Sequence, residues 1–148
     1  MRSPACLVAL GLLAGCSNPP LATTLTATSP SPAPDVFQCA RNQLKAVKFN
    51  QSSIDLDAQR VTARRYDETV RRPDVQFRRL VHRLEIEAVP SGEDAVTRLE
   101  ITARTFGEYT TQRGPTETQE KTSDAALAAA ETILQRCSRP VDSLSVPG

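Results

Sequence analysis

The chain has 148 residues, of which 39% are hydrophobic, 4% aromatic and 24% charged, and its formal net charge is +1. A chain of this length forms one domain of ordinary size, or a smaller domain with tails. The near-neutral charge gives no global field that would attract nucleic acid or another polyanion. Because no run of about 18 or more apolar residues occurs, we expect no membrane-spanning helix.

The first residues have the pattern of an export signal. Arg2 is followed by an apolar run over residues 5–13, which is too short to cross a bilayer but suits the hydrophobic region of a signal peptide. The run ends in Leu13-Ala14-Gly15-Cys16. This sequence resembles the lipobox of bacterial lipoproteins, in which small residues precede an obligatory Cys. The alternative is an ordinary secretory signal with a chance cysteine.

The resemblance to bacterial lipoproteins implies a lipid anchor and a cell-envelope location. In that family the thiol, here that of Cys16, receives a diacylglyceryl group, and a signal peptidase removes the residues before it. The freed amine is then often acylated, typically by palmitate. Two or three chains make a stable anchor, because each buried CH₂ contributes about 0.8 kcal/mol. Asp after the Cys tends to retain Gram-negative members in the inner membrane, so Ser17 favours the outer membrane, facing the periplasm.

Composition divides the chain into four parts. Residues 1–15 are the expected signal peptide, and residues 16–34 follow as the lipidated cysteine and an extended tether, rich in Pro and Thr and without charge. We expect a folded domain over residues 35–139 and a flexible tail over residues 140–148. A tether of this length in extended form would lift the domain about 50 Å from the membrane.

Helical periodicity predicts one helix at each end of the domain. Asp35, with Gln three residues later, has the pattern of a capping box, so we expect the first helix over residues 35–47. A second cap at Ser123 or Asp124 begins an Ala-rich segment. Alanine has the highest intrinsic helix propensity, which makes this segment the clearest helix of the chain.

The middle of the domain alternates apolar and polar residues with a period of two, which is typical of strands. Residues 79–89 and 95–105 flank turn residues at 90–93, so we expect a hairpin there. A register that places Glu85 opposite Arg98 would pair opposite charges on the solvent face and apolar groups on the other.

A second, weaker hairpin joins residues 54–56 to residues 61–63. Together the elements predict an α+β domain of the order α-β-β-β-β-α. Its antiparallel sheet would have about four strands and two helices packed on one face. The polar residues 107–123 are expected to be a long loop, which is either mobile or functional.

The cysteines indicate one disulfide. Cys6 leaves with the signal peptide and Cys16 is lipidated, so only Cys39 and Cys137 remain. Outside the cytoplasm two remaining thiols usually pair, and this bond would join the start of the first helix to the end of the last. A redox role is the alternative, but no Cys-x-x-Cys spacing supports it.

Side chains with catalytic or metal-binding chemistry are scarce. Asp55 and Asp57 could act as an acid–base pair, but two acids beside a turn are more often solvated strand-end residues. His82 would lie opposite Ile101 on the apolar face, where a histidine is more often packed than catalytic. We expect no metal and no cofactor, because a metal would lack further ligands and the glycines form no phosphate-binding loop.

Arginine doublets are the most unusual feature of the chain, and there are three of them: Arg64 and Arg65, Arg71 and Arg72, Arg78 and Arg79. Guanidinium clusters suit bidentate binding of carboxylate or phosphate. In the envelope such groups belong to anionic lipid, polysaccharide or an acidic protein surface. The alternative is a solvated face balanced by the acidic second half of the domain. Nucleic acid is not an expected partner, since stacking aromatics are few.

The sequence therefore predicts a lipid-anchored, non-enzymatic cell-envelope protein whose domain binds a protein partner or an anionic envelope component. The alternative is an enzyme that modifies envelope polymers with Asp55, Asp57 or His82. The two classes differ in whether these side chains line one concave pocket, because catalysis needs convergent groups.

Overall fold

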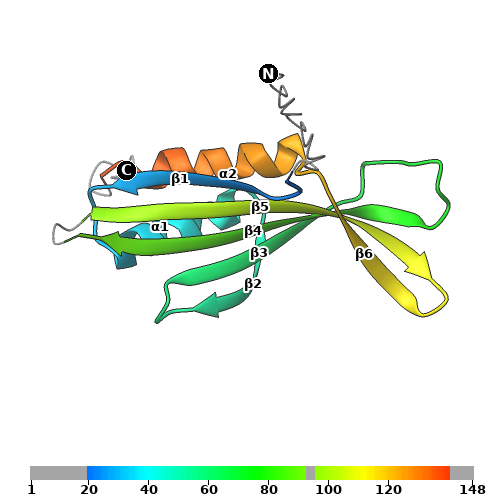
Figure 1. Cartoon of the computed structure of the whole chain (residues 1–148), viewed down its shortest axis with the longest axis horizontal. Helices are drawn as coiled ribbons and strands as arrows, with labels where there is room; N and C mark the ends of the chain where they lie inside the picture. The colour runs from blue at the N-terminus through cyan, green and yellow to red at the C-terminus, as the bar shows by residue number, and fades with distance from the viewer. Residues whose placement is uncertain (1–19, 93–95, 141–148) are drawn as a thin grey trace, which may run out of the picture.

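The computed structural model describes residues 20–92 and 96–140, which form one antiparallel sheet and two helices. The elements in chain order are β1 (Thr23–Ser29), α1 (Ala33–Ala46), β2 (Asn50–Asp55), β3 (Arg60–Asp67), β4 (Phe77–Ser91), β5 (Val96–Thr111), β6 (Gly114–Glu120) and α2 (Asp124–Cys137). The strand order is β1-β5-β4-β3-β2, and β6 also pairs with β5 (Figure 1). The predicted α+β class is confirmed.

The long strands β4 and β5 pass through two different parts of the molecule. Residues 97–103 of β5 pair with β1, and residues 105–111 pair with β6. We call the part that contains β1, β2 and both helices the body. We call residues 68–83 and 104–120 the arm, which extends beyond the helices (Figure 1).

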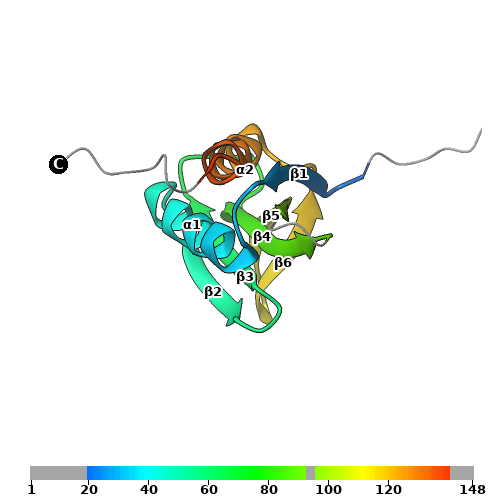
Figure 2. The same ribbon diagram turned by 90° about the vertical axis from the view of Figure 1, so that its left-hand side faces the viewer.

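The hydrophobic core lies in the body, between the helices and the middle of the sheet (Figure 2). Leu84 and Ile86 on β4 and Leu99 and Ile101 on β5 are fully buried. Helix residues such as Ile133 complete this cluster. Because each buried aliphatic side chain contributes about 1.5–3 kcal/mol, the body holds most of the hydrophobic stabilisation.

The helices cover different parts of a twisted sheet. α2 packs along β5 and β1, whereas α1 packs against β4 and β5 and extends toward β2 and β3 (Figure 2). The prediction of about four strands with both helices on one face is therefore wrong in both details: the sheet has six strands, and the helices do not share one face. The right-handed twist of long strands turns successive parts of a sheet in different directions.

β1 lies within the segment predicted to be a tether, residues 16–34, and corrects that prediction. Leu25 and Ala27 are half-buried, and the threonines that alternate with them are exposed. β1 pairs with β5 far along the chain, with Leu25 opposite Ile101. The prediction used only the Pro- and Thr-rich composition of this segment. The alternate positions of its threonines, which are β-branched, favour a strand instead. Residues 17–22 remain as the connection, which spans at most about 25 Å from Cys16 to β1.

The two helices differ in how well the sequence located them. α1 begins earlier than predicted, with Pro32 at its N-cap and no side-chain capping bond, so the capping box at Asp35 does not form. A proline in the first turn presets φ and needs no donor there, which explains the early start. In α2 the predicted cap is confirmed, because Ser123 accepts a hydrogen bond from the Ala126 N–H. Within residues 20–92 and 96–140 no helix is long and apolar enough to span a membrane.

The hairpin of β4 and β5 forms, but its register differs from the prediction. Arg98 lies opposite Val89 rather than the predicted glutamate, and Glu87 faces Glu100. The third strand compensates this like-charge pair, because Arg60 on β3 donates to Glu87 at 2.9 Å. Pairing two strands in isolation gave the wrong register because the charges are balanced across three strands.

Two further predictions concern segments that form strands. The weaker hairpin is confirmed as β2 and β3, with Ile54 opposite Val61. The predicted loop over residues 107–123 is instead the end of β5 followed by β6. The turn between them contains Gly114 at a φ of +108°, a backbone conformation that favours glycine. Threonine-rich alternation on both sides of this turn favours strands, which polarity alone did not indicate.

The predicted disulfide between Cys39 and Cys137 is confirmed. The two Cα atoms are 5.8 Å apart, and both side chains are buried. The bond joins the first half of α1 to the last residue of α2, so it holds the two helices together at one end of the body.

Candidate functional site

The structure separates the predicted catalytic candidates. Asp55 pairs with Arg60 at the β2–β3 turn, while His82 pairs with Arg65 further along β3. Five strand residues span about 16 Å, so the acids and the histidine do not line one pocket. Asp55 accepts a hydrogen bond from the Ala58 N–H at 3.0 Å, which stabilises the turn. Cys16 lies outside the described residues.

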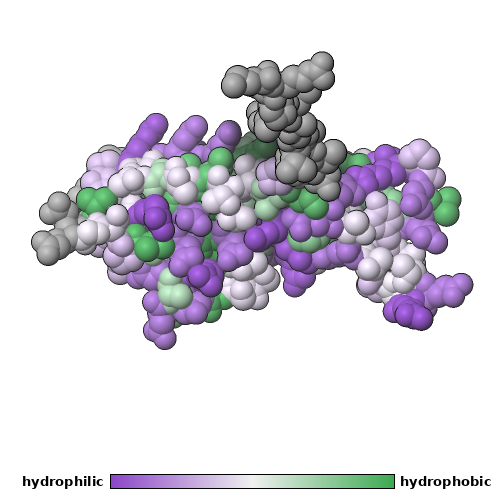
Figure 3. Space-filling view, in the orientation of Figure 1, coloured by the Kyte–Doolittle hydropathy of each residue, from purple (hydrophilic) through white to green (hydrophobic). Residues whose placement is uncertain are grey.

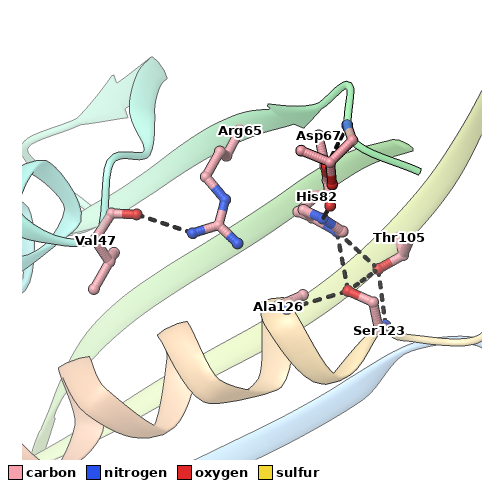
Figure 4. Close-up of polar contacts among 8 residues, drawn as sticks. Val47, Arg65, Asp67, His82, Thr105, Ser123 and Ala126 are labelled. Carbon is pink, nitrogen blue, oxygen red and sulfur yellow. Dashed lines mark hydrogen bonds and ion pairs between the residues drawn. The ribbon is translucent and has the colours of Figure 1, made fainter. Parts of the chain in front are cut away.

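His82 is fully buried where the arm joins the body (Figure 4). Its Nδ1 lies 3.0 Å from Ser123 Oγ and 3.3 Å from Thr105 Oγ1. Ser123 Oγ also accepts from the Ala126 N–H, so the ring is linked to the first turn of α2. The other ring nitrogen, Nε2, has no hydrogen bond in the described part of the chain and lies 3.8 Å from Asp67 Oδ2.

This row of serine, histidine and aspartate favours a structural link over a catalytic triad. The Ser123 hydroxyl is engaged as a helix cap, and His82 is 0% exposed. Burial lowers the pKa of His82, and the charge of Arg65 lowers it further, although Asp67 opposes this. The ring is therefore neutral at pH 7. It lies opposite Thr105 rather than the predicted isoleucine, because of the shifted register.

Arg72 and Arg79, two of the six predicted anion-binding residues, hold the arm together. The Arg72 guanidinium donates to both carboxylate oxygens of Glu120 at 2.6 Å and lies 4.4 Å from the centre of the Phe77 ring. Arg79 donates to Glu108 at 3.1 Å and lies 3.8 Å from the centre of a tyrosine ring. These paired and stacked guanidiniums take the place of an aliphatic core where no helix covers the sheet.

Three other predicted arginines face solvent. Arg64 is exposed on β3, and Arg78, at 55% side-chain exposure, is 4.0 Å from a glutamate oxygen. Arg71 donates to two main-chain carbonyls of its own loop. Arg71 and Arg78 line a pocket of about 380 Å³ in the arm together with Glu68, and Val75 in the same loop is 97% exposed.

Arg65 lies apart from the other five, beside the C-terminal end of α1 (Figure 4). Its Nη1 donates to the carbonyl of Val47 at 3.2 Å, and its guanidinium lies 4.8 Å from the centre of the Phe49 ring. Within the described ranges no carboxylate oxygen lies within 4.0 Å of this guanidinium. Among the described residues, Arg65 is thus a half-buried cation without a direct ion pair.

Arg65 lines a groove between the end of α1 and α2, with a volume of about 430 Å³. Lys48 adds a second cation, and the remaining lining residues are small or apolar: Ala46, Val47, Ala125, Ala128, Ala129 and Thr132. The four α2 residues follow helical i, i+3, i+4, i+7 spacing. That spacing is the sequence signal that could have indicated this groove. The groove was not predicted, because the helical pattern of α2 was used only to assign the face that packs on the core.

Comparison with known proteins gives no family. No protein family matches the sequence, and no curated protein is similar to it in sequence. Among solved structures the chain is similar to TTHA0849 from Thermus thermophilus, with a TM-score of 0.39 and 15% identity over 84% of this chain and 99% of that chain.

Proposed function

We propose that this protein is a lipid-anchored, non-enzymatic component of the bacterial cell envelope whose arm binds a partner protein. The observation that carries the proposal is the Leu13-Ala14-Gly15-Cys16 sequence at the end of a short apolar run, which would place lipid on Cys16. The disulfide between Cys39 and Cys137 supports an oxidising location outside the cytoplasm. Ser17 favours the outer membrane if the organism has one.

The short connection would hold the body close to the membrane. Residues 17–22 span at most about 25 Å between Cys16 and β1. The Leu21 carbonyl accepts a hydrogen bond from Thr122 Oγ1 at 3.0 Å, so the chain reaches the body beside the N-terminus of α2. The arm begins at the same junction and extends beyond both helices (Figure 1).

The arm has the properties of a binding element. Ion pairs and ring stacking hold its strands. Its loop presents Val75 to solvent, and Arg71 and Arg78 line a pocket in the same arm. Figure 3 shows a hydrophobic group at the outer end of the arm, surrounded by hydrophilic surface. An exposed apolar side chain and exposed guanidiniums in one arm suit a partner surface that combines apolar and acidic side chains.

The alternative, an enzyme acting on envelope polymers, has less support. Asp55 and Asp57 lie at the exposed β2–β3 turn. His82 is 0% exposed and lies on β4, opposite the other end of β3. A general acid and base need to converge on one substrate position. This separation of the candidate groups favours a binding protein.

Site-specific photo-cross-linking tests the arm as a binding surface. A photoreactive residue in place of Val75 in the full-length protein is expected to give one discrete adduct in living cells. Reversing both neighbouring charges, with Arg71→Glu and Arg78→Glu, is expected to remove most of that adduct, because charge complementarity governs partner association. The matched control is the same photoreactive residue at Thr26, an exposed position on β1. Equal adducts from both positions, or an adduct insensitive to charge reversal, would contradict the proposal.

A further inference from the structure

We infer that the groove lined by Arg65, Lys48 and α2 binds one anionic lipid of the membrane that carries the protein, with the lipid phosphate at the two cations. This inference rests on the lipid anchor of the proposed function and is independent of the arm. Four observations support it: the unused donors of Arg65, the second cation, the apolar wall of α2, and the position of the groove relative to the anchor.

The Arg65 guanidinium is held in position by contacts that use only part of its N–H donors. A guanidinium has five N–H donors, and the hydrogen bond to the Val47 carbonyl uses one of them. The Phe49 ring supports its plane. The acid that follows on the same strand, Asp67, lies beyond ion-pair distance of Arg65, and one of its oxygens accepts two hydrogen bonds from Thr69, at 2.9 and 2.6 Å. A fixed guanidinium without an ion pair is preorganised for bidentate binding of phosphate.

Lys48 brings a second positive charge to the same groove. It follows Val47, the C-cap of α1, and has a φ of +62°, so the chain turns there and continues into β2. This turn places Lys48 and Arg65 in the lining of one groove, although they belong to different elements. No acid belongs to that lining in the described part of the chain. The site is therefore complementary to an anion.

The other side of the groove is apolar. Ala125, Ala128 and Ala129 form a wall of methyl groups along α2, and Ala46 and Val47 close the groove at α1. The volume of about 430 Å³ lies within the range of small-molecule sites. A free phosphate would use the cations and leave this wall uncovered. A phosphate that carries acyl chains would contact the cations with its phosphate and the apolar wall with its acyl chains.

One end of the groove lies close to the point where the described chain begins. Leu21 is hydrogen-bonded to Thr122, immediately before the cap of α2, and Ala125 in the first turn of α2 lines the groove. From Cys16 the chain reaches Leu21 over at most about 18 Å. Leu21 itself is 45% exposed. A lipid of the anchoring membrane is therefore within reach of Arg65 and Lys48.

Native mass spectrometry of the full-length lipidated protein, released from a non-ionic detergent, tests this inference. Dimyristoyl phosphatidylglycerol and dimyristoyl phosphatidylcholine are added in separate arms, and inorganic phosphate in a third. We expect one bound phosphatidylglycerol, retained about tenfold more than phosphatidylcholine, because the guanidinium adds charge-assisted hydrogen bonds. Inorganic phosphate alone is expected to give no adduct.

Paired variants locate the binding site. Arg65→Gln combined with Lys48→Gln is expected to abolish the preference for phosphatidylglycerol. Arg64→Gln, which changes the exposed neighbour without touching the groove, is expected to preserve it. Lys48→Gln alone is expected to weaken the preference. Lys48 is exposed, and its substitution leaves the contact between Arg65 and Phe49 intact, so this variant controls for a folding defect in the double variant.

Three results would overturn the inference: equal retention of both lipids, a phosphate adduct as abundant as the lipid adduct, or an equal loss in Arg64→Gln. The same spectra report the acyl mass on Cys16. A preference for phosphatidylglycerol in a chain without acyl mass would overturn the proposed anchor and leave the groove as a lipid site.

Discussion

Replacing Cys39 and Cys137 together by alanine is expected to lower the free energy of unfolding by about 4–5 kcal/mol. The disulfide joins residues with a sequence separation of 98, so it strongly restricts the unfolded chain. Domains of this size have a total stability of about 5–15 kcal/mol, so the variant would retain only part of it. Buried contacts of α1 and α2 with the sheet would still hold the helices in place.

Urea unfolding of the full-length protein and of the double variant measures this loss. A reductant should destabilise the wild-type protein by the same amount and should leave the variant unchanged, which separates the disulfide from other effects of the substitutions. A loss below about 1 kcal/mol would contradict a stabilising role, since the loop-closure term alone is several times larger.

Gly107→Ala is expected to open the arm while the body stays folded. A Cβ at this position would lie 2.5 Å from Glu120 Oε1 and 2.8 Å from Tyr109 Cε2. The carboxylate cannot yield freely, because Arg72 holds both of its oxygens. Overpacking of this kind costs about 1–3 kcal/mol. Since no helix covers β6, the cost should fall on local opening of the arm.

Hydrogen exchange followed by mass spectrometry separates local from global effects. Amides of residues 114–120 are expected to exchange about tenfold faster or more in Gly107→Ala, whereas residues 84–88 of the core should be unchanged. Thr118→Ala is the matched control, because Thr118 is exposed and lies opposite Gly107 on β6. Equal acceleration in body and arm, or none in the arm, would contradict this account of how the arm is held.

Local patterns predicted the elements whose determinants lie close together in the sequence. The Ala-rich segment became α2 with its serine cap, and the alternating segments became β2 to β5. The disulfide was predicted by counting the thiols that would remain after the expected export and lipidation. β1 and β6 were missed because their polar, threonine-rich sequences were interpreted from composition as a tether and a loop. Both pair with β5, and for β1 that partner is distant in the sequence.

The candidate sites also depend on partners that lie on other segments of the chain. The arginine doublets are adjacent in sequence, but neighbouring residues of a strand face opposite sides of the sheet. Arg64 is therefore exposed on one side, while Arg65 reaches the groove at α2. Arg72 and Arg79 meet carboxylates contributed by β6 and β5, which no sequence pattern near them indicated.

The most direct test of the central claim is the intact mass and detergent partitioning of the full-length protein produced in a bacterium, beside a Cys16→Ser variant. The account predicts a mature chain that begins at Cys16, carries added acyl mass and enters the detergent phase, and a variant that loses both properties. A wild-type chain without acyl mass that stays in the aqueous phase would contradict the lipid anchor, and with it the proposed location in the envelope.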